Sequence, residues 1–326
     1  MRTEPTDGVP WAQRRTRMRV FIAGGTGLVG TRLVAQLLAR GDQVVVLTRR
    51  PEVAKLKWGE TCTIVAGDPL VQGPWMGAIA DCDAVVNLVG ENLFARRWRA
   101  WFKELLYTSR IKSTENIATA VSQQPRVATG KAKVLVNASA IGYYGPHGDE
   151  ELTEESLPGS DFLAHLCVDW EKAALLPSAA GARVVIVRVG VVLDRAGGAL
   201  GKMLTPFKMF VGGPVGSGKQ YVSWIHHEDM VGLILFGLDN VQAAGPMNAT
   251  APNPATNKQF SKALGRALRR PSFLPTPKFM LRLMLGPVAG IVTTGQRVLP
   301  RRALDLGYAF RFPDLGPALQ DVLSRG

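Results

Sequence analysis

The chain has 326 residues, of which 46% are hydrophobic, enough for one large α/β domain with an added lobe or for two domains. Its formal net charge is +13, but the basic residues are dispersed and do not alternate with stacking aromatics. We therefore expect no specific nucleic-acid site, and we assign the charge to a solvated surface and an anionic cofactor. The three scattered cysteines predict a reducing compartment without a metal site, and no apolar run is long enough for a transmembrane segment.

Residues 1–18 are polar, basic and rich in Pro, Thr and Arg, and we interpret them as a disordered extension. A partial organelle transit sequence is the alternative, although Glu4 and Asp7 argue against it. We therefore expect a cytoplasmic protein, or one of an organelle stroma or matrix if the extension is a targeting remnant.

An apolar strand at residues 20–23 leads into three glycines spaced by three, and an amphipathic helix follows over residues 28–40. This order is typical of a dinucleotide-binding βαβ unit. Gly24 permits a sharp turn, Gly27 lets the backbone approach a pyrophosphate, and Gly30 lets the helix pack closely. The helix N-terminus offers free N–H groups and a partial positive charge to the phosphates. The predicted cofactor-binding residues here are Gly24, Thr26, Gly27, Leu28, Val29 and Gly30.

The second strand, residues 43–47, indicates which nucleotide is bound. An NAD site usually places an acid at the end of this strand for the ribose 2′-hydroxyl. Here that place holds Thr48, Arg49 and Arg50, and Asp42 lies at the other end of the strand. Guanidinium groups suit a 2′-phosphate, so Arg49 and Arg50 predict NADP(H) as the cofactor. The alternative is that the two arginines only begin a surface loop.

Strand and helix patterns alternate up to residue 192, which predicts a doubly wound parallel (Rossmann) sheet with helices on both faces. The expected strands are 20–23, 44–47, 63–66, 84–89, 134–138 and 184–189. The expected helices are 28–40, one around 97–123, 163–180, 228–238, 257–269 and 277–285. Glycine-rich loops follow between Gly197 and Gly218. We therefore predict an NADP-binding domain at 19–196 whose sheet is completed by 220–250, and a smaller, mainly helical C-terminal lobe formed by 197–219 and 251–326.

In an open α/β sheet the ligand lies beyond the carboxyl ends of the strands, so the segments that leave those ends are the candidate site. Several of these segments match a known family. They include Gly67-Asp68, residues 87–92 (NLVGEN), Ser109-Arg110, residues 139–145 (SAIGYYG) and Trp170-Glu171, and the match continues through residues 188–193, 212–214 and 224–226 to the tail at 295–300.

With these motifs the chain resembles the extended short-chain dehydrogenase/reductases, and more narrowly their atypical, epimerase-like family with a C-terminal DUF1731 segment. The resemblance covers roughly residues 19–325. It implies a Rossmann domain that binds NADP(H), with Asp68 near the adenine. It also implies that Asn87, Leu88, Val89 and Gly90 lie under the adenosine ribose.

The catalytic pair of this superfamily is absent. Its members use a Tyr with a Lys four residues later, and these positions are Leu163 and Cys167 here. The position of the superfamily's serine is Ala140, with Ser139 one residue earlier. The name "epimerase" is therefore a family label, and this sequence does not establish an epimerase activity.

The remaining polar groups near the predicted crevice each have a functional and a structural interpretation. Glu91 and Arg110 form either an acid/base or substrate clamp or a structural ion pair. Ser139 and Tyr144 are candidate proton donors, with packing as the alternative. Tyr143, Trp224 and His226 are candidate substrate contacts, although a histidine at the end of a strand can equally cap a helix or lie in the core.

Two functions from different classes fit these residues. The first is an NADP(H)-dependent oxidoreductase or epimerase that acts on an unknown small molecule through non-standard catalytic groups. The second is a non-catalytic, regulatory or assembly protein in which bound NADP(H) sets the shape presented to a protein partner. In either case the protein can form a homodimer or act with another protein partner. We expect at least three of Glu91, Arg110, Ser139, Tyr144 and His226 to line one pocket.

Overall fold

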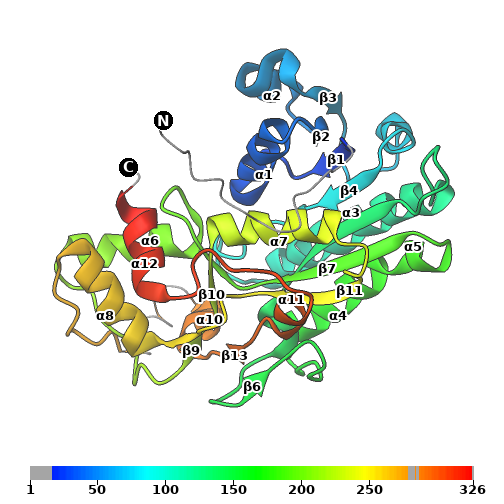
Figure 1. The fold of residues 1–326 in the computed structure, drawn as a ribbon. Coiled ribbons are helices and arrows are strands. Elements are labelled where there is room, and N and C mark those ends of the chain that lie inside the picture. The colour runs from blue at the N-terminus through cyan, green and yellow to red at the C-terminus, as the bar shows by residue number, and fades with distance from the viewer. Residues whose placement is uncertain (1–16, 278–282, 284–285, 325–326) are drawn as a thin grey trace.

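The computed structural model describes residues 17–277, 283 and 286–324. Its centre is a seven-stranded sheet in the order β11-β7-β5-β4-β1-β2-β3, in which every neighbouring pair is parallel (Figure 1). The order reverses between β1 and β4, which places the ligand crevice at the carboxyl ends of these two strands. The doubly wound fold expected from the sequence is confirmed. The strands are β1 (Arg19–Ala23), β2 (Gln43–Thr48), β3 (Thr63–Ala66), β4 (Ala84–Asn87), β5 (Val134–Ala140), β7 (Arg183–Val189) and β11 (Gly245–Ala249).

Helices cover both faces of this sheet, because its strands are apolar on both sides. Val20 and Ile22 of β1 pack in one core with residues of α1 and α7, whereas Phe21 and Ala23 pack in the other core with residues of α3. The helices are α1 (Leu28–Ala39), α2 (Pro51–Trp58), α3 (Ala100–Gln123), α4 (Phe162–Ala174), α5 (Leu176–Ala179), α6 (Gly198–Lys208), α7 (His227–Asp239), α8 (Asn257–Leu268), α10 (Ala289–Thr293), α11 (Arg301–Asp305) and α12 (Leu315–Ser324).

A smaller C-terminal lobe has a core of its own, to which α6, α8 and α12 contribute Leu204, Phe260 and Leu319 (Figure 1). Three two-stranded ladders join this lobe to the sheet. They pair β8 (Val191–Leu193) with β10 (Trp224–His226), β9 (Tyr221–Val222) with β12 (Ala255–Thr256), and β6 (Glu151–Leu152) with β13 (Arg297–Val298).

Some expected elements differ from the observed ones. The single helix expected over 163–180 is two helices, α4 and α5, because Pro177 cannot continue the i to i−4 hydrogen-bond pattern. The stretch from Gly197 to Gly218, expected to be loops, contains α6. The helix expected at 277–285 and the extension expected at 1–18 fall mostly outside the described residues. Within the described ranges, each helix is too short or too polar to cross a membrane.

Candidate nucleotide-binding crevice

The glycine-rich turn after β1 is sterically closed to larger residues. Gly24 has φ +84°, and a Cβ there would lie 2.8 Å from the carbonyl carbon and oxygen of Leu88, just after β4. A Cβ on Gly30 would lie 2.2 Å from the carbonyl oxygen of Gly24. The first glycine therefore permits the turn, and the third permits close packing of α1 against that turn.

The N-terminus of α1 is suited to an anion. Gly27 is its N-cap and provides no side-chain acceptor, and the first turn of α1 contains no acidic residue. The first N–H groups of a helix have no acceptor within the helix, and they lie at the positive end of its dipole. Thr26 and Gly27 are exposed beside them. A phosphate group at this place would satisfy the N–H groups of Leu28, Val29 and Gly30.

Two arginine side chains follow the carboxyl end of β2, which pairs in parallel with β1 and so ends at the same edge of the sheet as the glycine-rich turn. Arg49 and Arg50 are exposed, and the Arg50 amide donates to the hydroxyl of the buried Thr48. Asp42 lies at the opposite end of β2, where it accepts from the Met18 amide and pairs with Arg40 at 3.3 Å. Two cations therefore stand at the end of β2, Asp42 has a structural role at the other end, and the exposed Glu52 of α2 lies 4.0 Å from Lys55.

The segment after β4 is held firmly by Asn87. The Asn87 amide nitrogen donates to Thr114 and Asn137, and its oxygen accepts from the Val89 amide. Both N–H donors of this fully buried side chain are used inside the protein, so it shapes the turn through Leu88, Val89 and Gly90. Asp68 is half-buried, and its carboxylate accepts from the Leu70 amide.

Five side chains form a buried polar network at the carboxyl ends of β5 and β7. The Glu171 carboxylate accepts from the Ser139 hydroxyl at 2.7 Å and from two nitrogens of Arg188 at 2.8 Å each. Arg188 also donates to the Tyr144 hydroxyl at 2.9 Å, and that hydroxyl donates to Asn248 at 2.7 Å. Each polar group is satisfied, and the network joins β5, α4, β7 and β11.

Burial affects the chemistry of this network. Ser139 is 2% exposed and Tyr144 is 0% exposed. Desolvation raises the pKa of Tyr144 to about 12, against the opposing effect of Arg188. Proton transfer by either residue therefore requires the network to open, and their catalytic roles stay predictions.

Leu163 and Cys167, which stand at the superfamily's Tyr and Lys positions, both lie close to Gly142. A Cβ on Gly142 would lie 3.3 Å from Cβ of Leu163 and 3.7 Å from Sγ of Cys167. Both side chains thus point from α4 toward the segment after β5, as their i, i+4 spacing predicts. Burial raises the pKa of Cys167 to about 12, so its thiol is neutral near neutral pH.

Glu91 and Arg110 meet through the backbone of Glu91. The Arg110 guanidinium donates to the backbone carbonyl of Glu91 at 2.9 Å and to that of Leu106, and it lies over the Trp170 ring. The Glu91 carboxylate is half-buried and accepts from the Asn92 amide. Desolvation lowers the pKa of Arg110. Arg110 therefore has a positioning role in holding the 90–92 segment, and the Glu91 carboxylate is the more accessible group.

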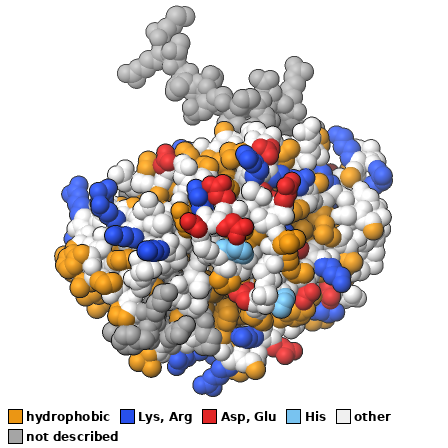
Figure 2. Space-filling view, turned by 90° about the horizontal axis from the view of Figure 1, so that it is seen from below, with side chains coloured by type: hydrophobic (Ala, Val, Ile, Leu, Met, Phe, Trp, Pro, Cys, Tyr) orange, Lys and Arg blue, Asp and Glu red, His pale blue; other side chains and the backbone are white. Residues whose placement is uncertain are grey.

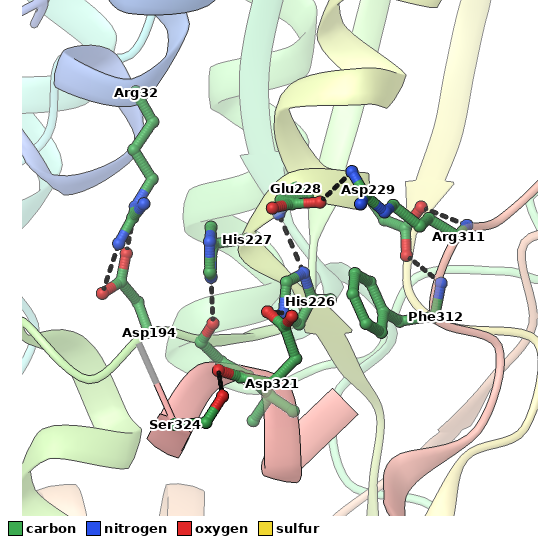
Figure 3. A network of polar contacts seen from close by, with 11 residues as sticks. Arg32, Asp194, His226, His227, Glu228, Asp229, Arg311, Phe312, Asp321 and Ser324 are labelled. Atoms are coloured by element: carbon green, nitrogen blue, oxygen red, sulfur yellow. Dashed lines mark hydrogen bonds and ion pairs between the residues drawn. The ribbon is translucent and has the colours of Figure 1, made fainter. Parts of the chain in front are cut away.

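The three candidate substrate residues separate into two groups. Trp224 and His226 are fully buried. His226 caps α7 by accepting from the Glu228 amide, stacks on Phe312 and pairs with Asp321 at 3.2 Å (Figure 3). Both side chains are thus inaccessible in this structure, Trp224 within the core of the C-terminal lobe, and their contact with a substrate stays a prediction. Tyr143 is half-buried, with Arg188 3.5 Å from its ring centroid, and remains a candidate.

The segment that leads from β8 into the C-terminal lobe reaches the start of α1. Arg32 of α1 makes two hydrogen bonds to Asp194, at 2.6 and 3.1 Å (Figure 3). Cβ positions on Gly197 and Gly198 lie 3.5 and 3.4 Å from the side chain of Leu28. The segment 194–198 is therefore attached to the first turns of the helix that would hold the phosphates, and it leads directly into α6.

The loop after β4 also crosses the crevice. Lys202 of α6 donates to the Phe94 carbonyl, and Arg97 donates to the Leu283 carbonyl. These contacts join the NADP-binding part to the C-terminal lobe on a second side.

The expected shared pocket is not formed by the described side chains. Ser139 and His226 are buried and do not line a hollow together with the other three. A hollow of about 580 Å³ lies over residues 144–161, and Tyr144 is its one member from the predicted set. Among the described residues, no group of His, Cys, Asp and Glu is arranged to hold a metal ion.

Sequence reasoning assigned no role to Arg32, Asp194, Glu171 or Arg188, although these residues form the strongest polar contacts of the crevice. Arg32 and Asp194 lie 162 residues apart, and no spacing rule connects them. Glu171 and Arg188 were visible only as parts of family motifs.

Comparisons with known proteins agree with this architecture. The model of the NAD-dependent epimerase/dehydratase family matches residues 20–249, and that of DUF1731, a domain of unknown function, matches residues 276–322. The chain is 39% identical over 312 residues to the epimerase family protein SDR39U1 of Bos taurus, covering 94% of this chain and 100% of the relative. It is 38% identical to a chloroplastic SDR39U1 homologue of Arabidopsis thaliana, covering 96% and 88%.

A solved structure is also similar. The crystal structure of the human epimerase family protein SDR39U1 (isoform 2) with NADPH matches with a TM-score of 0.82 and 37% identity, over 94% of this chain and 100% of the human one.

Proposed function

Because the chain belongs to the NAD-dependent epimerase/dehydratase family and has the DUF1731 segment at its C-terminal end, we propose that it binds NADP(H) in this crevice. The observation that carries the proposal is the positive end of β2, where Arg49 and Arg50 are exposed beside an α1 N-terminus without an acidic residue. A similar human protein has been solved with NADPH. The bound nicotinamide would supply a hydride donor or acceptor.

The residues of this chain divide the task of holding the nucleotide. Arg49 and Arg50 bind the 2′-phosphate with planar, charge-assisted donors. Gly24 and Gly30 keep the turn compact, so that the backbone at Thr26 and Gly27 is open to the pyrophosphate. Asp68 and the 87–90 segment line the adenosine side, as the resemblance to the family implies.

We propose that nucleotide occupancy mainly controls the position of the 194–198 segment. The Leu28 side chain lies close to Gly197 and Gly198, and Arg32 binds Asp194, so the phosphate-binding helix is joined to the segment that leads into the C-terminal lobe. The groups expected to transfer protons are replaced, as at Leu163 and Cys167, or held in a satisfied network, as at Ser139 and Tyr144. This arrangement favours a binding and regulatory protein over an enzyme of the usual type.

Two measurements test this proposal. In fluorescence titrations, NADPH should bind at least about tenfold more tightly than NADH, because only NADPH carries the 2′-phosphate. Equal affinities would overturn the cofactor assignment. In hydrogen exchange, NADPH should slow the amides of α6 in the wild type but not in Arg32→Ala, whereas the amides of α5 should respond in neither protein. Equal protection of α6 in both proteins would contradict the coupling.

An oxidoreductase or epimerase is the second candidate, and the half-buried Glu91 and Tyr143 favour it. Both leave the carboxyl ends of central strands, and their side chains retain accessible surface. If they act on a small molecule, NADPH oxidation in the presence of a panel of carbonyl compounds should be detectable. Glu91→Gln and Tyr143→Phe should then lower this rate without weakening NADPH binding. Unchanged rates in both variants would exclude these two residues.

A further inference from the structure

A group of large apolar side chains is exposed where α6 ends. Met209 is 66% exposed and Phe210 55%, and on the neighbouring 270–276 loop Phe273 is 74% exposed. Val211 and Leu274 are also exposed, and we call these five residues the α6-end patch. Figure 2 shows hydrophobic side chains gathered on the left side of the molecule, over the C-terminal lobe. Exposed apolar patches of this kind usually mark interaction surfaces.

The two segments of the patch form one surface. A Cβ on Gly213 would lie 2.0 Å from the carbonyl oxygen of Leu274, and the Thr276 amide donates to the Pro214 carbonyl. The Arg270 guanidinium lies 4.5 Å from the centroid of the Phe210 ring. The apolar side chains are therefore displayed side by side, with a cation directly among them.

The backbone holds the patch in an unusual conformation. Within the patch, Phe210 has φ +63°, and just before the 270–276 loop Arg269, with φ +55°, is the left-handed C-cap of α8. The turn is nevertheless fixed from beneath, because a Cβ on Gly212 would lie 2.4 Å from the ring of the buried Phe207. Strained residues persist where the surrounding structure holds them, and they cluster at functional sites.

The surroundings of the patch are positively charged without interruption. Residues 197–222 and 251–277 together contain eight Lys and Arg and no Asp or Glu. All eight are exposed, and Lys258, Lys262 and Arg266 follow an i, i+4 spacing along one face of α8. Lysine and arginine side chains beside the left-hand patch are visible in Figure 2. These two segments therefore combine apolar side chains with a cationic surface that favours an anionic partner.

We propose that the α6-end patch docks this protein on the surface of an anionic lipid bilayer. Phe210, Met209 and Phe273 would enter the boundary between headgroups and acyl chains, and the surrounding cations would contact lipid phosphates. A second copy of the chain is a poor occupant, since it would place equal positive charge on both sides. A nucleic acid would neutralise the cations but leave most of the apolar surface without an apolar partner.

The test is co-sedimentation of the full chain with vesicles. Vesicles of phosphatidylcholine and phosphatidylserine in equal parts should bind the wild type at least about tenfold more strongly than vesicles of phosphatidylcholine alone. The double variant Phe210→Asn/Phe273→Ser should lose most of this binding, and Asn tolerates the positive φ at position 210. Lys262→Gln/Arg266→Gln should weaken binding and reduce its salt dependence.

Leu56→Ser is the matched control, because Leu56 is 91% exposed between Lys55 and Lys57 on α2, away from the patch. It should bind vesicles as the wild type does. An unchanged thermal midpoint and unchanged NADPH affinity in every variant separate the docking surface from the fold and from the proposed cofactor site. Failure of the wild type to bind phosphatidylserine vesicles would overturn the proposal. The proposal would also be overturned if Phe210→Asn/Phe273→Ser still bound both vesicles and single-stranded DNA. Such binding would indicate a surface that attracts any polyanion without specificity.

Discussion

The two ends of the crevice use their polar groups in opposite ways. At the phosphate end, Arg49, Arg50 and the first turn of α1 present positive charge with few protein acceptors. At the other end, Glu171 and Arg188 are buried and satisfied by each other, by Ser139 and by Tyr144. The first end is arranged to receive an anion, and the second is already complete without a ligand.

This difference shows which part of the site can be lost without loss of the fold. Removing the cations of the phosphate end leaves little unsatisfied inside the protein. Removing one member of the buried network leaves a charge without its counter-ion, which is costly. Substitutions in the phosphate end should therefore change nucleotide affinity, whereas substitutions in the buried network should change the free energy of unfolding.

The largest effect is expected for Glu171→Gln. Arg188 is 3% exposed, and Glu171 raises its pKa by hydrogen bonds and charge. Loss of the carboxylate should lower the free energy of unfolding by about 3–5 kcal/mol, measured by urea denaturation. Glu150→Gln, at an exposed glutamate, should change it by less than about 0.5 kcal/mol. An equally small loss for Glu171→Gln would show that the network does not stabilise the fold.

A smaller effect is expected from the titration of Tyr144. Its pKa is raised to about 12 from the usual 10.0, so the folded state retains the phenolic proton after the unfolded state has lost it. The contribution of Tyr144 to the free energy of unfolding is about 2–3 kcal/mol. It is complete below about pH 10 and is lost between about pH 10 and pH 12. Tyr144→Phe should therefore lose less stability over this range than the wild type does, in urea unfolding at a series of pH values. Other alkaline groups titrate in both proteins and cancel, so parallel curves would contradict this assignment.

Sequence reasoning recovered the parts of the molecule that depend on local order. The strand, the three glycines and the helix of residues 19–39 are contiguous, so their geometry follows from neighbouring residues. The position of α6 was missed, because the glycines at 197 and 198 indicate a loop. The apolar Leu200, Leu204 and Phe207 have helical spacing and all three are buried, which was the available signal.

The contacts between distant segments could not be predicted in the same way. Arg32 and Asp194 meet because α1 and the segment after β8 pack together in three dimensions, and neither residue belongs to a recognisable motif. His226 ends the strand β10, but Phe312 and Asp321 from the C-terminal part of the chain cover it. Its burial depends on how the C-terminal lobe folds back, which sequence spacing does not encode.

At the phosphate end, Arg49→Ala and Arg50→Ala should act on cofactor choice and not on stability. Each should lower the affinity for NADPH by about tenfold, or about 1.4 kcal/mol, and should leave that for NADH nearly unchanged. Lys55→Ala removes an exposed cation six residues after Arg49 and is the matched control. Fluorescence titration of both nucleotides measures the ratio. A parallel loss of NADPH and NADH affinity would show that the arginines do not contact the 2′-phosphate.

The smallest effect is expected at Cys167, which occupies the place of the superfamily's lysine. Its thiol is 2% exposed, and burial raises its pKa to about 12, so near neutral pH it is neither charged nor available to a proton relay. Cys167→Ser should therefore change the NADPH affinity by less than about twofold, while stability falls by about 1 kcal/mol because the smaller hydroxyl fills this buried place less well than the thiol. In the native wild type, a thiol reagent such as DTNB should label Cys167 only as fast as the protein unfolds. Rapid labelling that NADPH blocks, or a large loss of NADPH affinity in Cys167→Ser, would show that this end of the crevice opens to the cofactor after all.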